Sequence, residues 1–144
     1  MKNLFTMVAL LIVLSFAACN NDDEPNAHDK KLNMISAKSW GDATVTHADG
    51  DLSSQYGDFV IVFNKNSSNG FDGSYVIAKG GYAFSETSGK WKFSDDLTQI
   101  IFDSGKEMDF ELTGSSLQLD FTVAAAGGRA AGLSGHFIFD LKPL

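Results

Sequence analysis

The sequence predicts an all-β protein, an up-and-down antiparallel β-barrel of about eight strands. Three observations support this prediction. Apolar and polar residues alternate with a period of two from residue 34 onward, turn signals recur about every 8–12 residues, and no segment shows a convincing amphipathic helical pattern. Short connections make strands that follow one another in the sequence pair in space, and closure of the sheet removes its exposed edges. The length of 144 residues suits one domain.

The predicted strands occupy most of the chain after residue 38. The first covers Ser39–His47, the second covers 59–63 and is apolar on both faces, and a short one covers 82–84. The others show clear alternation and cover 71–78, 88–94, 107–112, 116–123 and 136–141. Turn signals separate the strands at Asn69-Gly70, Gly80-Gly81, Asp95-Asp96, Ser104-Gly105 and Thr113-Gly114-Ser115.

Large aromatic side chains dominate the apolar side of these strands. Beyond residue 18 the chain holds ten phenylalanines and two tryptophans. An eight-stranded barrel is just wide enough to be filled by its own side chains or to hold one small ligand. We therefore keep two interpretations of the rings, a filled core and an apolar pocket at the mouth of the barrel. For the pocket, Trp40, Tyr75 and Trp91 are the predicted ligand contacts.

Residues 1–18 have the pattern of a bacterial signal peptide. Lys2 supplies the positive charge, and the apolar run 4–18 is shorter than the about 20 residues that a membrane-spanning helix needs. Ala17 and Ala18 precede the single cysteine, Cys19, and this arrangement resembles a lipobox. The resemblance implies cleavage before Cys19, diacylglycerol on its sulfur and acylation of the new N-terminus, which would anchor the protein in a membrane. The alternative is plain secretion after Ala-x-Ala cleavage.

Residues 19–31 are predicted to form an acidic, flexible tether before a domain at 32–144. The run from Asn20 to Pro25 is polar and has no periodic apolar pattern. Its acidic residues directly after Cys19 resemble the surface-export signal of Bacteroidota lipoproteins. This resemblance implies an outer-membrane protein displayed at the cell surface. The alternative is the periplasmic face of that membrane, with charges that only solvate the tether.

Several motifs of the domain also resemble a known family. They are, in order, Trp40, the segment 59–63, Phe71-Asp72-Gly73-Ser74-Tyr75, Ser88-Gly89-Lys90-Trp91-Lys92-Phe93, Ile100-Ile101-Phe102 and Leu112-Thr113-Gly114-Ser115-Ser116-Leu117-Gln118-Leu119. This order, which spans residues 32–144, looks like the lipocalin-like domain families of Bacteroidota lipoproteins. The resemblance implies a lipocalin-like barrel and an envelope location, and it implies no reaction.

Composition and motifs argue against several functions. A formal net charge of −7 and a pI of about 4.7 disfavour nucleic-acid binding, which requires a surplus of Lys and Arg. One cysteine excludes a disulfide framework and a multi-thiolate metal site. The segment 132–136 resembles the nucleophile elbow of serine hydrolases, but its second glycine comes one residue too early. The segment 47–51 resembles part of a calcium-binding loop, but it lacks the bidentate glutamate that such a loop requires. We therefore predict no enzyme activity, no metal and no cofactor.

Acidic residues gather on the polar side of one strand. Glu107, Asp109 and Glu111 alternate with apolar residues, so their carboxylates are expected in water, with Asp103 and Asp120 on neighbouring strands. Their spacing of about 6.5–7 Å would suit an inverting glycosidase, but catalytic acids need a cleft that raises one pKa. We therefore interpret the stripe as a solvated face, with a contact for a basic partner as a hypothesis.

These observations predict a lipid-anchored module that binds a small apolar or amphipathic ligand at the mouth of the barrel. The segment 124–132, which is the longest predicted loop, is a candidate lid or a flexible connection. The alternative function is that of a non-catalytic accessory or scaffold subunit that uses its outer faces in an envelope protein complex. In both cases the membrane contact runs through the acyl chains on Cys19.

Overall fold

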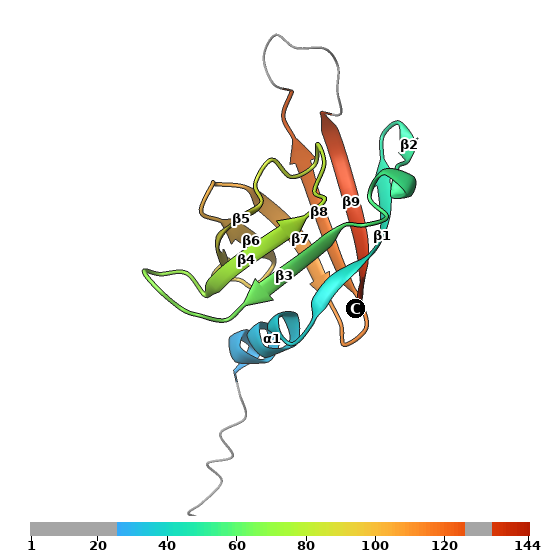
Figure 1. The fold of residues 1–144 in the computed structure, drawn as a ribbon. Helices are drawn as coiled ribbons and strands as arrows, with labels where there is room; N and C mark the ends of the chain where they lie inside the picture. Colours follow the sequence, from blue (N-terminus) through green and yellow to red (C-terminus); the bar gives the residue numbers. More distant parts are fainter. Residues whose placement is uncertain (1–25, 126–133) are drawn as a thin grey trace, which may run out of the picture.

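The strands form one antiparallel sheet that closes on itself. The structure is a computed structural model, and it describes residues 26–125 and 134–144. Within these residues the strand order is β2-β1-β3-β4-β5-β6-β7-β8-β9, and β1 also pairs with β9. This second pairing closes an eight-stranded barrel of β1 and β3 to β9, and β2 is an extra strand paired with the end of β1 (Figure 1). The predicted up-and-down antiparallel barrel is confirmed.

The elements are short and follow one another through brief connections. Their bounds are α1 (Ala27–Ser36), β1 (Ser39–His47), β2 (Gly50–Asp51), the 3-10 helix η1 (Ser53–Gln55), β3 (Val60–Asn64), β4 (Gly73–Ala78), β5 (Ser88–Phe93), β6 (Gln99–Phe102), β7 (Glu107–Leu112), β8 (Leu117–Val123) and β9 (Gly135–Pro143).

Alternate residues of the barrel strands point into a core of aromatic and aliphatic side chains, as the period of two predicts. In β8, for example, Leu117, Leu119 and Phe121 are buried and the residues between them are partly exposed. Rings from different strands meet inside the barrel. The ring centres of Phe121 and Phe139 lie 5.8 Å apart, and those of Phe59 and Phe139 lie 5.1 Å apart. The aromatic residues therefore form the core of the barrel.

The predicted strand at 82–84 is wrong, and a strand outside the predicted set takes its place. Lys79 and Gly81 both have a φ of 57°, a left-handed backbone at which the chain turns instead of extending. The eighth barrel strand is β6, which pairs with β5 and β7 and buries Ile100 and Phe102. Its four residues are too few for their alternation to be recognised in the sequence.

The expectation of no helix, with a flexible tether up to residue 31, is wrong for the last part of that tether. Helix α1 begins at Ala27, and the side chain of Asn26 caps it by accepting a 2.8 Å hydrogen bond from the amide of Asp29. Ile35 is the one fully buried residue of α1, so the helix shows little apolar periodicity. Contacts with the barrel stabilise it instead. The predicted signal peptide and the first part of the tether lie outside the described residues.

The barrel has two different ends. Helix α1 lies at the end where β1 begins, and it contacts β3 and β7 (Figure 1). This end is called the α1 end. The opposite end, called the far end, carries the β1–β2 hairpin and the connections from β4 to β5 and from β6 to β7.

Candidate functional site

A cavity of about 610 Å³ opens at the far end of the barrel. It lies between the β4–β5 connection, the β6–β7 turn and the end of β8, and its wall includes Tyr82, Glu86, Ser104, Lys106 and Val123. The volume falls within the range of about 300–1,000 Å³ that is typical of small-molecule sites. Because the wall combines apolar surface with an ion pair, the cavity can hold a molecule that has both a polar and an apolar part.

Glu86 and Lys106 form the polar part of this wall. The Nζ atom of Lys106 lies 3.8 Å from Oε2 of Glu86 and donates a 2.6 Å hydrogen bond to the carbonyl oxygen of Ala83. The hydroxyl of Ser104 donates to Oε1 of Glu86 at 2.8 Å. The exposed fraction of the side chain is 16% for Lys106 and 19% for Glu86. The pair thus joins the β4–β5 connection to the β6–β7 turn in a partly desolvated setting, where charges interact more strongly than at the surface.

The ammonium group of Lys106 also lies over two aromatic rings. Its Nζ atom is 4.6 Å from the ring centre of Phe84 and 4.8 Å from that of Phe121. Burial lowers the pKa of Lys106, and the negative charge of Glu86 offsets only part of this effect. Burial raises the pKa of Glu86, but hydrogen bonds, first that from Ser104, and the charge of Lys106 outweigh it and hold this pKa below its ordinary value. The cavity wall therefore carries two opposite charges, and the rings of Phe84 and Phe121 lie behind Lys106 in the core.

Buried polar atoms without a hydrogen-bond partner gather in the far half of the barrel. Among the described residues, the side-chain atoms of this kind are Nε2 of His47, Oη of Tyr56, Oη of Tyr75 and Oε2 of Glu86. His47 ends β1, Tyr56 comes shortly before β3, and Glu86 precedes β5, so these residues belong to the far end. Buried polar groups are almost always hydrogen-bonded in proteins, to protein atoms or to ordered water. Ordered water is the usual partner of such groups.

The three predicted ligand contacts are core residues. Trp40 and Trp91 are fully buried, and Tyr75 is 1% exposed. The indole N–H of Trp40 donates to the carbonyl of Ile35 at 2.9 Å, and that of Trp91 donates to the carbonyl of Asn64 at 3.4 Å. Both tryptophans lie toward the α1 end, and neither they nor Tyr75 line the cavity at the far end. The structure does not bring the three residues together in one pocket.

Tyr75 is the one of the three that lies close to the charged groups of the site. Its ring stacks on that of Phe102, with 3.8 Å between the ring centres and 12° between the planes. Burial raises the pKa of Tyr75 to about 12, and the negative charges of Glu86 and Asp103 add to this effect. The phenol is therefore neutral at physiological pH, and its hydroxyl can both donate and accept a hydrogen bond.

Sequence reasoning missed Glu86 and Lys106 as site residues. The signal for Lys106 is its position, because it comes two residues before Met108 and four before Phe110, which both point into the barrel. A lysine in this inward series is unusual enough to mark a site. Glu86 lies in the irregular connection between β4 and β5, where no periodic pattern gives its direction.

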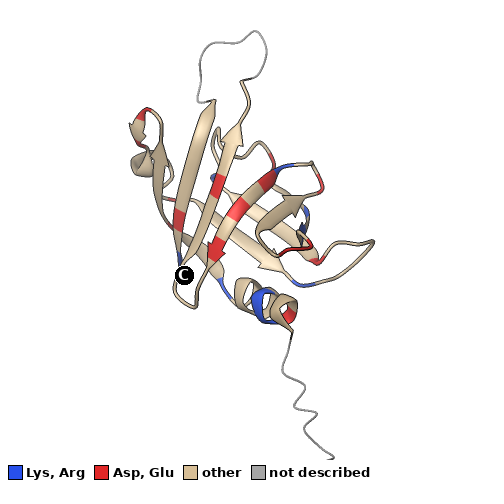
Figure 2. Cartoon of the chain, turned by 180° about the vertical axis from the view of Figure 1, so that it is seen from behind, with Lys and Arg blue, Asp and Glu red and all other residues tan. Residues whose placement is uncertain are grey.

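Acidic residues lie on the neighbouring strands β7, β8 and β9 (Figure 2), at positions that are exposed or partly exposed. They are called the outer band. The predicted exposure of Glu107, Asp109 and Glu111 is confirmed, and Asp109 lies opposite Asp120 as expected. The predicted place of Asp103 in this band is wrong. Ile101 is the residue opposite Glu107, and Asp103 follows the end of β6 in the turn.

Several carboxylates of this outer band already have hydrogen-bond partners on neighbouring strands. The contacts are Gln99 to Asp109 at 2.8 Å, Gln118 to Asp140 at 2.7 Å and His136 to Asp120 at 2.5 Å. A hollow of about 340 Å³ lies over β7 and β8 between these groups. The band is a solvated surface whose carboxylates partly hydrogen-bond to neighbouring side chains.

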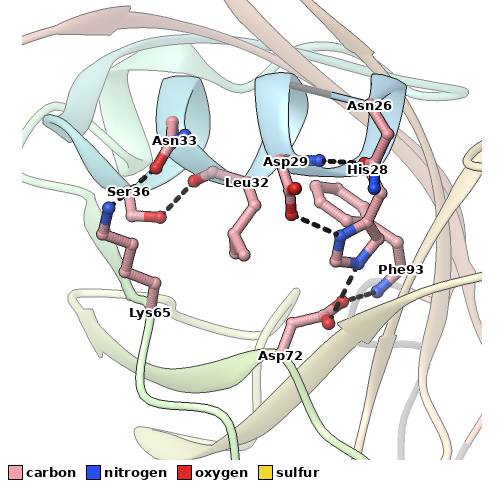
Figure 3. Close-up of polar contacts among 9 residues, drawn as sticks. All are labelled: Asn26, His28, Asp29, Leu32, Asn33, Ser36, Lys65, Asp72 and Phe93. Carbon is pink, nitrogen blue, oxygen red and sulfur yellow. Dashed lines mark hydrogen bonds and ion pairs between the residues drawn. The ribbon is translucent and has the colours of Figure 1, made fainter. Parts of the chain in front are cut away.

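At the α1 end, polar side chains attach the helix to the barrel (Figure 3). Nε2 of His28 lies 3.0 Å from Oδ1 of Asp72, and Oδ2 of Asp72 accepts a 2.8 Å hydrogen bond from the amide of Phe93. The His28 ring also packs edge-on against the ring of Phe93, with 5.7 Å between their centres. A hollow of about 390 Å³ beside these residues is the smaller counterpart of the far-end cavity. The contacts of His28 with Asp72 and Phe93 therefore attach α1 to the barrel.

Two of the predicted features, the lipidation site and most of the long loop, involve residues that the structure does not describe. The predicted lipidation site Cys19 lies outside the described residues, and so do residues 126–132 of the predicted loop. In residues 26–125 and 134–144, no three His, Cys, Asp or Glu side chains are grouped so that they could hold a metal ion. No helix in this part of the chain is long and apolar enough to cross a membrane.

Comparisons with known proteins gave no significant match. No protein-family model matches the chain, and no curated protein or solved structure is similar to it. The resemblance to lipocalin-like lipoproteins therefore stays a prediction, and the functional argument rests on the geometry of the barrel.

Proposed function

We propose that the protein is a binding module that takes a small amphipathic molecule into the cavity at the far end of the barrel. The observation that supports this most directly is the cavity of about 610 Å³, whose wall combines the Glu86–Lys106 ion pair with apolar surface. The polar head group of a ligand would lie near Ser104, Glu86 and Lys106. Its apolar part would lie against Tyr82 and Val123. The module holds its ligand without catalysing a reaction on it.

We also propose that the protein is a lipoprotein of the outer membrane, anchored through Cys19 and displayed at the cell surface, with the periplasmic face as the alternative. Helix α1 begins eight residues after Cys19 and lies at the end of the barrel opposite the cavity. A connection this short would keep the α1 end toward the membrane. The mouth of the cavity would then face the medium, from which a ligand could enter.

A titration of the full chain with an amphipathic fluorophore, anilinonaphthalene sulfonate, tests the binding site. We expect saturable binding, and we expect Ala124→Trp to weaken it strongly because the new ring would fill the cavity that Ala124 lines. Ala48→Trp is the matched control, since Ala48 lies in the exposed β1–β2 hairpin. Equal binding by both variants, or the absence of saturable binding to the unaltered chain, would contradict the proposal.

The alternative function, a non-catalytic subunit of an envelope complex, makes a different prediction for the same protein. Cross-linking in intact cells would then give a specific partner. The double variant Asp109→Lys, Glu111→Lys would remove the cross-link, because it reverses charge on the exposed face of β7 outside the cavity wall. A partner found together with a far end that binds no fluorophore would favour this alternative.

A further inference from the structure

We propose that Lys106 captures a small aliphatic aldehyde as a Schiff base inside the far-end cavity. The proposal rests on the proposed function, because it names the class of amphipathic ligand and the atom that would hold it. An aliphatic aldehyde has the required form, with one polar carbonyl group and an apolar chain.

The position of the Lys106 amine is the first argument. Lys106 lines the cavity although its side chain is only 16% exposed, so its amine is at the wall of the cavity and largely shielded from bulk water. A hydrogen bond to the carbonyl of Ala83 and the rings of Phe84 and Phe121 fix the amine in place. A held nucleophile reacts with a bound partner faster than a free one, because the encounter is already oriented.

The second argument is chemical. An amine attacks a carbonyl carbon only in its neutral form, and burial lowers the pKa of Lys106, which raises the neutral fraction at a given pH. The contrasting lysine is Lys142, whose side chain is 66% exposed and which pairs with Asp42 at 2.9 Å on the surface. Lys106 therefore has both the placement and the reactivity that Lys142 lacks.

Glu86 can carry the proton through the reaction, because its Oε2 atom lies 3.8 Å from Nζ. It takes a proton from the ammonium, and the freed lone pair of Nζ forms a bond to the aldehyde carbon. The carbonyl oxygen becomes the hydroxyl of a carbinolamine after a proton moves to it from nitrogen. Glu86 then returns its proton to that hydroxyl, which leaves as water, and a C=N bond forms. One aldehyde and one ammonium give one protonated imine and one water.

The site also suits the product. The protonated imine keeps a positive charge at the position of the ammonium, so the ion pair with Glu86 and the contacts with Phe84 and Phe121 persist. The aliphatic chain would replace water along the cavity wall near Val123 and Ala124. The groups that surround the free lysine therefore stabilise the imine as well.

The test is reductive trapping on the full chain. Purified protein is incubated at neutral pH with hexanal and cyanoborohydride, and the rate of hexyl addition at each lysine is measured by peptide mass spectrometry. We expect Lys106 to be modified at least about tenfold faster than Lys142, in line with its more reactive amine. Equal rates at the two lysines, or modification that spares Lys106, would overturn the proposal.

Two variants and one analogue make the result specific. Lys106→Arg keeps a cation but cannot form an imine, and it should abolish the fast modification. Glu86→Gln removes both the proton carrier and the charge that raises the pKa of Lys106. It should therefore shift the onset of trapping at Lys106 to lower pH and reduce the maximal rate severalfold. Hexanol has the same chain but no carbonyl, so its binding measures the affinity of the cavity without the covalent step. Saturable hexanol binding without fast trapping would overturn the covalent step and leave the proposed function standing, whereas loss of both would contradict both. The lysine-by-lysine comparison in the unaltered chain decides the proposal even where a variant fails to fold.

Discussion

The two ends of the barrel differ in their polar contacts and in the size of their cavities. At the α1 end, His28, Asp72 and the amide of Phe93 satisfy one another, and the indole of Trp40 donates to the last turn of α1. The buried polar side-chain atoms that have no hydrogen-bond partner in the described residues, such as Oε2 of Glu86, belong instead to the far half, which also has the larger described cavity. The contacts at the α1 end attach the helix to the barrel, whereas at the far end the Glu86–Lys106 pair lines a cavity. The proposed binding site therefore lies at the far end.

The largest expected effect comes from Trp40, which fills the barrel at the α1 end. Trp40→Ala should lower the free energy of unfolding by about 3–5 kcal/mol, because it leaves a cavity and removes the hydrogen bond to Ile35. Urea titration followed by circular dichroism measures this change. The folded fraction should still bind the fluorophore. Loss of binding at unchanged stability would show that Trp40 is a ligand contact, as the sequence first predicted, and would break the distinction between the two ends.

A smaller effect is expected from the polar contacts that hold α1. Asp72→Ala should destabilise the fold by about 1–3 kcal/mol, because the buried amide of Phe93 and the ring of His28 both lose their partner. His28→Ala should cost less, about 0.5–1.5 kcal/mol, since it removes a single contact. A double-mutant cycle in urea measures the coupling of the pair. Full additivity of the two changes would mean that His28 does not use Asp72 to attach the helix.

At the far end, the charged pair should contribute to stability as well as to binding. Lys106→Met should destabilise by about 1–3 kcal/mol, because the half-buried Glu86 is left without its cation. Lys142→Met, which breaks an exposed pair with Asp42, should change stability by about 0.5 kcal/mol or less. Adding Glu86→Gln to Lys106→Met should recover much of the loss. Equal effects of the two lysine substitutions would show that the far-end pair is no more desolvated than a surface pair.

The smallest expected effect is a pH dependence that originates at Glu86. The folded-state pKa of Glu86 lies below its ordinary value of 4.5, because the Ser104 hydrogen bond and the Lys106 charge outweigh the effect of burial. The stabilisation from a depressed carboxyl pKa is complete above the unfolded-state value and is lost as the pH falls through the folded-state value. Unfolding measured from neutral pH to below 4.5 should therefore show a smaller acid-side loss for Glu86→Gln than for the unaltered chain. Identical acid profiles would contradict this assignment.

Periodicity predicts the barrel well and the site poorly, for a physical reason. Alternation identifies the buried side of a strand such as β8, since each second residue must leave water. It says nothing about connections, so Glu86 and the turn at 82–84 are missed, and a strand as short as β6 carries too few periods to be recognised. Helix α1 is missed because tertiary contacts, and not its own pattern, hold it. Lys106 is the exception, because its inward position can be read from its spacing to Met108.

Native mass spectrometry of the full chain, purified in mild detergent from its own cell envelope, tests the central claim most directly. We predict a reproducible extra mass that remains through gentle ionisation and leaves on denaturation, and we predict that Ala124→Trp loses it while Ala48→Trp retains it. That result would place a natural ligand in the cavity beside Glu86 and Lys106. A bare monomer from the same envelope, or an extra mass that Ala124→Trp carries equally, would contradict the account of the far end as a binding site.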